Sequence, residues 1–267
     1  MIDLTRINYP AFDKPEISRI LFYPRRETAG SQGVDPEQLM IPVDNDVTVG
    51  GRFHGSGQES PTILFFHGNG EIAADYDDIG AVYRGMGINL LPVDYRGYGL
   101  SSGKPTVTAM MRDSHSIFEF VSAWLAGGGF TGPLIVMGRS LGSAPALEIA
   151  FHNGERVAGL IIESGFARIL PLLSLLGIHA PELTEASGPQ NLEKIRGVRK
   201  PTLVIHAEYD HIIPFAEGKE LYEASGAAEK KLLEIPGADH NNIFSHGMKQ
   251  YLDAIKFFME IVLKQRH

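Results

Sequence analysis

Residues 138–142, Gly-Arg-Ser-Leu-Gly, have the spacing of a serine nucleophile held in a tight turn. They follow the apolar run PLIVM and precede a helical pattern, which is the context that the G-x-S-x-G motif requires. A serine at such a sharp strand-to-helix turn adopts a strained backbone conformation that exposes its hydroxyl. Gly138 and Gly142 lack the side chains that would collide with the adjoining strand and helix. The motif therefore predicts Ser140 as a nucleophile.

A serine hydroxyl is a weak nucleophile until a base takes its proton, and that base needs an acid to orient it. Asp210 ends the run PTLVIHAEYD, and His240 follows the run KLLEIPGAD. Both runs are typical of buried strands, whose carboxyl ends meet at one edge of a parallel sheet. The order along the chain predicts Asp210 as the orienting acid and His240 as the base.

Two other carboxylates compete with Asp210 for the role of acid. Asp239 is adjacent to His240, but neighbouring side chains diverge, which disfavours a contact with the same ring. Glu163 also ends an apolar run and is the second candidate for the acid. His206 lies within an apolar strand pattern, which indicates a buried core residue.

An oxyanion that forms at Ser140 needs two backbone donors. The N–H of Leu141, directly after the nucleophile, is the first candidate. The second is expected in the loop that follows the apolar run PTILFF. We favour Asn69 there, then Gly70, and we expect His67 to hold the loop in place.

The segments around these residues alternate between two patterns. Short apolar runs closed by Gly, Asp or a polar turn recur as PTILFFHGNG, INLLPVDYRGYG, PLIVMGRSLG, VAGLIIESG and PTLVIHAEYD, with KLLEIPG as a weaker copy. Such runs indicate strands buried on both faces of a parallel sheet. Amphipathic patterns between them predict helices over 72–86, 106–126, 143–152, 215–225 and 248–263. This order is typical of a doubly wound, mostly parallel α/β sheet.

Two regions depart from the alternation. Residues 38–56 indicate a hairpin that turns at 44–46, and the segment before them carries little signal beyond an extended character over 18–23. A long connection follows the VAGLIIES run and begins with the apolar stretch 169–178. Long connections within compact domains are usually functional. We expect either a short cap or pocket wall over about 165–195, or a helix that packs on the core.

Composition excludes several classes of protein. The chain has 267 residues, is 43% hydrophobic, contains no cysteine and carries a net charge of -8. The absence of cysteine excludes a disulfide framework, a thiolate nucleophile and a cysteine-ligated zinc site. Net negative charge argues against nucleic acid as a partner. With no signal peptide and no transmembrane segment in the pattern, we expect one cytoplasmic domain over residues 1–267.

From about Pro61 onward the chain resembles the α/β-hydrolase superfamily. The resemblance lies in the HGNG loop, in GRSLGS, and in the aspartate and histidine near the C-terminus, all in the family's order. The DYRGYG loop at 94–99 is similar to that of a branch with serine esterases that lack a large lid and some protein-depalmitoylating thioesterases. The resemblance implies an eight-stranded sheet with a short insertion after the sixth strand. It also implies Ser140, Asp210 and His240 as the triad, with Asn69 and Leu141 as oxyanion donors.

These features together predict a serine hydrolase that cleaves a carboxylic ester or thioester through an acyl-enzyme. No cofactor and no metal is expected, the partner is a small-molecule or acyl-chain substrate, and the sequence leaves the oligomeric state open. One alternative is a serine peptidase or amidase on the same fold. Another is a hydrolase-like binding protein without turnover.

Overall fold

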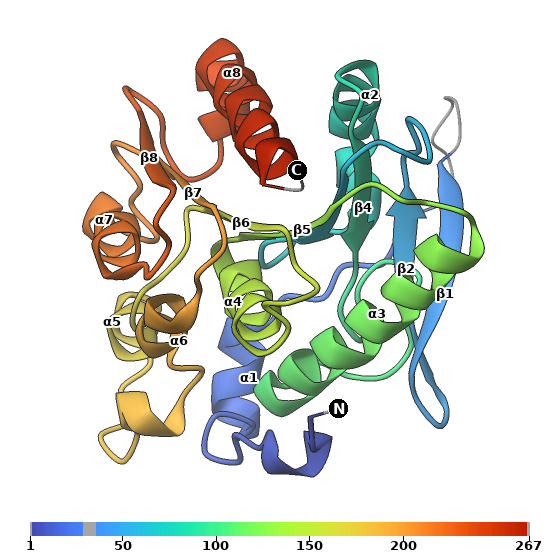
Figure 1. Cartoon of the computed structure of the whole chain (residues 1–267). Coiled ribbons are helices and arrows are strands. Elements are labelled where there is room, and N and C mark those ends of the chain that lie inside the picture. Colours follow the sequence, from blue (N-terminus) through green and yellow to red (C-terminus); the bar gives the residue numbers. More distant parts are fainter. Residues whose placement is uncertain (1, 29–35, 266–267) are drawn as a thin grey trace. The chain divides into compact units, whose positions relative to one another are not determined.

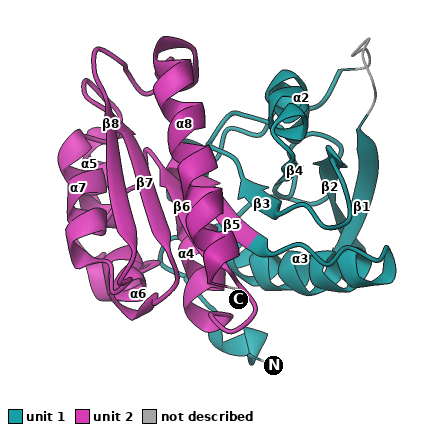
Figure 2. Cartoon of the chain, turned by 45° about the horizontal axis from the view of Figure 1, so that its top comes forward, with its two compact units in different colours: residues 1–134 teal, residues 135–267 magenta. Residues whose placement is uncertain are grey.

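Two compact units, residues 1–134 and residues 135–267, make up the chain (Figure 2). The computed structural model describes residues 2–28 and 36–265. Eight strands lie within those residues and most of their pairings are parallel, so the predicted α/β fold class is confirmed. The single domain remains a prediction, and residues 1, 29–35 and 266–267 of it lie outside the described residues.

The first unit contains four strands in the order β1-β2-β4-β3. The strands are β1 (Glu37–Asp44), β2 (Val47–Phe53), β3 (Thr62–Phe66) and β4 (Asn89–Val93). The β1–β2 hairpin turns at residues 45–46 as the sequence predicted, β2 runs antiparallel to β4, and β3 runs parallel to β4. The helices are η1 (Leu4–Arg6), α1 (Pro15–Leu21), η2 (Ala73–Tyr76), α2 (Asp77–Gly85) and α3 (Val107–Gly127). Helices α2 and α3 lie on opposite sides of these strands (Figure 1).

The extended character expected over 18–23 is wrong for 18–21, because residues 15–21 form helix α1, and an extended backbone begins only at Phe22. Pro15 occupies the first helical position, where its fixed φ suits a helix and its missing N–H costs nothing. Ile17 and Leu21, four positions apart, are the buried residues of the helix. That spacing was the available signal, and the apolar run from Ile20 to Tyr23 obscured it.

The second unit contains four parallel strands in the order β5-β6-β7-β8. The strands are β5 (Leu134–Arg139), β6 (Gly159–Glu163), β7 (Thr202–Ala207) and β8 (Lys230–Ile235). The helices are η3 (Ser140–Gly142), α4 (Ser143–His152), α5 (Ile169–Leu175), η4 (Glu185–Ser187), α6 (Asn191–Gly197), α7 (Phe215–Ala224) and α8 (Ile243–Lys264). Helix α8 covers one side of these strands, and α4, α6 and α7 cover the other (Figure 1).

The central strands β6 and β7 are buried along their whole length, as their continuous apolar runs predicted. Side chains on both faces of a strand can be apolar only when helices cover both faces of the sheet. The buried runs of β5, β6 and β7 give way to polar residues at their carboxyl ends, whereas β8, the weaker copy of the pattern, is partly exposed along most of its length.

Most predicted helices are confirmed to within a few residues. Helix α3 begins after Thr106, whose side chain accepts a hydrogen bond from the Ala109 N–H and so caps the helix. The last helix was expected over 248–263 but spans Ile243–Lys264 and has a non-helical backbone at Gly247. A Cβ on Gly247 would lie 2.4 Å from Cγ2 of Ile235, so the glycine lets the start of the helix lie against β8.

The connection over 165–195 contains α5, η4 and the start of α6. Its role as a cap or pocket wall remains a prediction. Among residues 2–28 and 36–265, no helix combines the length and the apolar character that a membrane span requires.

Candidate active site

Ser140 sits at the turn between β5 and the helical segment that follows it. Its φ is +52°, a conformation that residues with a side chain rarely adopt. A Cβ on Gly138 would lie 2.1 Å from the carbonyl oxygen of Gly142 and 2.7 Å from Cβ of Ala146. Only glycine at position 138 therefore permits the chain to turn this sharply and present the serine hydroxyl.

The start of helix α4 stabilises the same turn. The Ser143 hydroxyl donates a hydrogen bond to the Ser140 carbonyl oxygen at 2.7 Å. Pro145 is the third residue of α4, and the helix runs without a break to His152. The first N–H groups of a helix have no partner inside it, so this proline removes no helical hydrogen bond.

His240 lies between Ser140 and Asp210. Its Nε2 is 3.1 Å from Oγ of Ser140, and its Nδ1 is 2.7 Å from Oδ2 of Asp210. Both contacts are satisfied when Nδ1–H donates to the carboxylate and Nε2 accepts from the serine hydroxyl. In that tautomer the imidazole can receive the proton of Ser140.

The carboxylate of Asp210 is fixed by its own loop. Its Oδ1 accepts hydrogen bonds from the backbone N–H groups of Ile212 at 3.0 Å and Ile213 at 2.7 Å. Burial raises the pKa of Asp210, but the hydrogen bond and charge of His240, together with the Ile213 N–H, lower that pKa by a larger amount. The net pKa lies below the ordinary value, so Asp210 is ionised and can stabilise a protonated imidazole.

The other two candidate acids have different partners. Asp239 accepts from the backbone N–H groups of Asn241 and Asn242, so it stabilises the turn that carries His240. One oxygen of Glu163 lies 3.1 Å from Nε of Arg139, and its other oxygen accepts from the Tyr251 hydroxyl at 2.5 Å.

Sequence reasoning missed Arg139 and Tyr251. The signal for Arg139 was available, since Arg139 and Glu163 are the last residues of consecutive buried strands and stand side by side in the parallel register. Tyr251 comes from α8, and no local pattern marks its partner.

His206 supports the loop of Asp210, as the expectation of a buried core residue indicated. Its Nε2 lies 2.8 Å from the Ile213 carbonyl oxygen and 3.6 Å from Oδ2 of Asp210. Burial lowers the pKa of His206, so the ring is neutral and Nε2–H donates to the carbonyl.

The predicted oxyanion donors come from both units. Leu141 is the second residue of η3, where an N–H has no partner inside the helix. In the first unit, Oδ1 of Asn69 accepts from the Tyr23 N–H and the Tyr98 hydroxyl, each at 2.7 Å. Gly70 follows with φ at +77°. An oxyanion site shared by these donors remains a prediction.

The loop that carries Asn69 is held at its base by His67, which is fully buried. Its carbonyl oxygen accepts from the Tyr95 hydroxyl at 2.6 Å, and its Nε2 lies 3.3 Å from Oδ1 of Asp94. Burial raises the pKa of Tyr95, which keeps that hydroxyl protonated as a donor. His67 and the DYRGYG loop thus brace one another.

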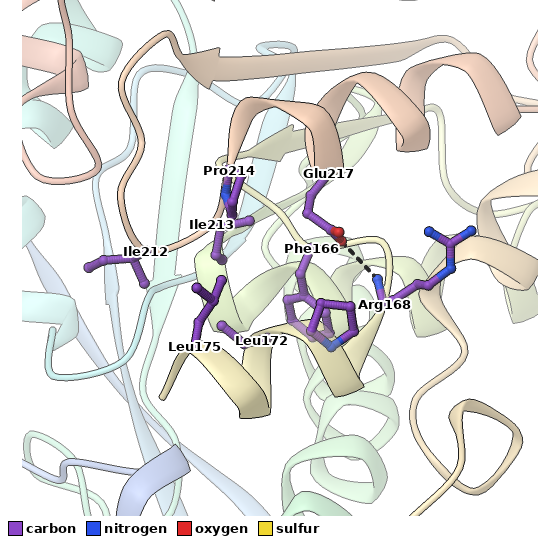
Figure 3. Close-up of a pocket in the computed structure, with 9 residues that line it drawn as sticks. Phe166, Arg168, Leu172, Leu175, Ile212, Ile213, Pro214 and Glu217 are labelled. Carbon is purple, nitrogen blue, oxygen red and sulfur yellow. Dashed lines mark hydrogen bonds between the residues drawn. The ribbon is translucent and has the colours of Figure 1, made fainter. Parts of the chain in front are cut away.

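A pocket in the second unit adjoins the loop of Asp210 (Figure 3). It has about 250 Å³ of empty volume, part of it open to solvent, and its lining is mostly apolar. Leu172 and Leu175 of α5 face Ile213 across it (Figure 3). The lining residues are Phe166, Arg168, Pro171, Leu172, Leu175, Ile212, Ile213, Pro214 and Glu217.

Carboxylates hold the start of α5 at this pocket. Glu217 accepts from the backbone N–H groups of Ala167 and Arg168 at 2.8 and 3.0 Å. Glu185 accepts from the N–H groups of Ile169 and Leu170 at 3.1 and 2.8 Å. The exposed donors of the helix start are thereby satisfied, which fixes the apolar wall of the pocket.

No group of three or more His, Asp or Glu side chains with the arrangement of a metal site occurs in the described part of the chain.

Residues 57–188 match a family model described as serine aminopeptidase S33. The match includes the HGNG loop and Ser140, and it ends before Asp210 and His240.

Two relatives of this chain are named as alpha/beta hydrolase domain-containing proteins. The alpha/beta hydrolase domain-containing protein aho-3 of Caenorhabditis elegans is 31% identical over 207 residues, which are 75% of this chain and 58% of that protein. The human alpha/beta hydrolase domain-containing protein 17B is 32% identical over 209 residues, which are 74% of this chain and 66% of that protein. This chain thus spans less than two thirds of the length of aho-3.

Solved structures share the fold. Est1E of Butyrivibrio proteoclasticus with bound ferulic acid superposes with a TM-score of 0.71 at 18% identity. The superposition covers 85% of this chain and 99% of Est1E. Identity at this level supports a common fold and nothing finer.

Proposed function

The chain belongs to the α/β-hydrolase superfamily, and within it we propose a serine hydrolase that cleaves a carboxylic ester or thioester. The observation that carries the proposal is the contact of His240 with Ser140 on one side and Asp210 on the other. Nucleophile, base and acid in hydrogen-bonding reach are the arrangement that acyl transfer requires.

In the proposed first step, Oγ of Ser140 attacks the carbonyl carbon of the substrate while Nε2 of His240 takes the hydroxyl proton. The charge that develops on the carbonyl oxygen is stabilised by the Leu141 N–H and the positive end of α4, with Asn69 or Gly70 as the second donor. Collapse of this intermediate breaks the bond to the leaving alcohol or thiol, and Nε2 of His240 returns the proton to it.

The second step releases the acid. Water attacks the acyl-enzyme while Nε2 of His240 takes one of its protons, and collapse returns that proton to Oγ of Ser140. Asp210 stays ionised throughout and stabilises the imidazolium in each half of the cycle. No redox step and no group transfer to a cofactor is needed for this balance.

The pocket beside Asp210 is proposed to take the acyl part of the substrate. Its wall is formed by α5 and by Ile212 and Ile213, whose N–H groups bind Asp210. An apolar pocket with few polar groups favours a hydrocarbon chain or ring. The bound ferulic acid of Est1E is consistent with an acyl compound in this superfamily. In this proposal, the connection over 165–195 acts as the pocket wall that the sequence predicted.

A serine peptidase or amidase is the second candidate, favoured by the description of the matching family model. Hydrolysis of p-nitrophenyl esters from acetate to palmitate, of an acyl thioester and of an aminoacyl anilide separates the two. We expect the parent protein to hydrolyse the esters and the thioester, and we expect Ser140→Ala to abolish this turnover. Faster turnover of the anilide would favour the peptidase, and equal ester turnover by Ser140→Ala would overturn both.

A further inference from the structure

A buried ion pair joins the nucleophile's strand to the residue proposed as the base. Nη2 of Arg139 donates to the carbonyl oxygen of His240 at 2.6 Å, and Nε of the same guanidinium lies 3.1 Å from Oε1 of Glu163. The side chains of Arg139 and Glu163 are 9% and 6% exposed. We infer that Arg139 is a positioning residue for His240, an inference that rests on the proposed function.

Three elements converge on this pair. Arg139 ends β5, Glu163 ends β6 at the paired position of the parallel register, and Tyr251 reaches Glu163 from α8. The backbone of Arg139 is bonded to Ser140, while its side chain binds the peptide of His240. Nucleophile and base are therefore held by one residue, although 100 positions separate them in sequence.

The physical reason lies in where His240 is carried. It belongs to the connection between β8 and α8, outside any helix or strand, and backbone in such connections is more mobile than in regular elements. A charge-assisted bond to its carbonyl restricts that backbone far more than a contact with water would. A guanidinium can bind a carboxylate and a carbonyl at once through its planar set of donors, which a lysine ammonium cannot reproduce.

Glu163 supplies the charge that makes a buried arginine tolerable. A buried cation without a counter-ion is costly, and its field would also disfavour a protonated His240. The charged and titratable groups around His240 include Asp210 at Nδ1, the neutral His206 beside Asp210, Asp239 in the same turn, and the Arg139–Glu163 pair at its carbonyl. The pair therefore places two opposite charges beside the His240 carbonyl, and removal of one member alone leaves the other charge uncompensated there.

Steady-state kinetics on a p-nitrophenyl ester test the inference with Arg139→Met, Arg139→Lys, Glu163→Gln and Tyr251→Phe. Neither Arg139 nor Glu163 touches the proposed substrate pocket, so we expect an unchanged KM and a kcat roughly 10- to 100-fold lower in Arg139→Met, because a misplaced base costs about this much. Arg139→Lys and Tyr251→Phe are milder changes that are expected to leave the protein folded. Both are expected to lower kcat less than Arg139→Met does.

The pH profile of kcat/KM provides the readout that a merely structural role would not move. The acidic limb, which reports the free enzyme's base, is expected to shift down by about half a pH unit or more in Glu163→Gln and up by a similar amount in Arg139→Met. The double variant Arg139→Met/Glu163→Gln should restore the limb while kcat stays low.

Arg196→Met is the matched control, because Arg196 lies exposed on α6 in an ion pair with Glu193. It should leave kcat, KM and the acidic limb unchanged. A kcat of Arg139→Met within twofold of the parent, or acidic limbs that do not move, would overturn the inference. Ser140→Ala distinguishes failure of the proposed function from failure of the inference about Arg139. Full activity in that variant would contradict the proposed function itself.

Discussion

Asp210 and His240, 30 residues apart in the sequence, meet through a 2.7 Å contact between Oδ2 and Nδ1. The two backbone N–H groups that bind the other oxygen of Asp210 come from Ile212 and Ile213, which also line the apolar pocket. One short loop therefore contributes both to the orientation of the base and to the wall of the proposed acyl site.

Asp210→Asn should abolish most of the activity without loss of the fold. When the amide NH₂ faces the ring it cannot accept a hydrogen bond from Nδ1–H, so the imidazole adopts the unproductive tautomer. We expect kcat roughly 1,000- to 10,000-fold lower with KM little changed. Glu163→Gln, measured in parallel, should lose far less, and a larger loss there would move the acid to Glu163.

Gly138→Ala should destabilise the turn that presents Ser140. Its Cβ would meet backbone of Gly142 at 2.1 Å, and backbone cannot move aside as a flexible side chain can. We expect the free energy of unfolding to fall by about 2 kcal/mol or more, as for other substitutions that force a steric clash in a core. Gly154→Ala is the matched control, since its nearest contact is the Ala150 carbonyl oxygen at 3.6 Å. Urea denaturation of both variants measures the difference.

Stability should depend on pH through His206. Burial lowers its pKa in the folded state from the ordinary value of 6.5. The unfolded chain then binds the proton more readily, so stability is complete above pH 6.5 and falls as the pH drops from there toward the folded-state pKa. Burial also lowers the pKa of His54, so both histidines contribute to this loss of stability at low pH.

Thermal unfolding between pH 7.5 and pH 5, a range chosen to bracket that titration, measures this dependence. His206→Gln removes one titrating group and keeps a side-chain N–H that can reach the Ile213 carbonyl. We expect its stability to change less with pH than that of the parent, by up to about 1.4 kcal/mol per pH unit. Parallel curves for parent and variant would show that His206 is protonated equally in both states.

Leu175→Trp should shorten the acyl chains that the protein accepts. Leu175 is 56% exposed at the rim of the pocket, so a larger side chain can be accommodated without disruption of the core. We expect kcat/KM for decanoate relative to acetate to fall about 10-fold, the scale on which apolar pockets discriminate by size. Leu263→Trp, on the exposed side of α8, should leave that ratio unchanged.

The strands and most helices were predictable because the order of apolar and polar residues within each segment reflects which of its side chains are buried. The runs at 160–162 and 203–205 are fully buried and continuous in the sequence, and Thr106 marks a helix start by its own chemistry. Helix α1 was not predictable with the same ease, because only Ile17 and Leu21 of it are buried. The break at Gly247 depends on contact with Ile235 of β8, which no local pattern records.

The residues of the site also fall into those that the sequence predicts and those that it does not. Ser140, Asp210 and His240 were named from the sequence because each follows a strand whose carboxyl end must face the same edge, and the structure has them in contact. The partners that hold them were not named. Glu163 was ranked as an alternative acid from its position alone, and only coordinates show its oxygens bound to Arg139 and Tyr251.

Labelling by a fluorophosphonate probe, followed by mass spectrometry of the modified peptide, tests directly whether Ser140 is the nucleophile. We expect one covalent adduct, on Ser140, with labelling slowed strongly by His240→Ala and absent in Ser140→Ala. Equal labelling of the parent and Ser140→Ala, or an adduct mapped to another serine, would contradict it.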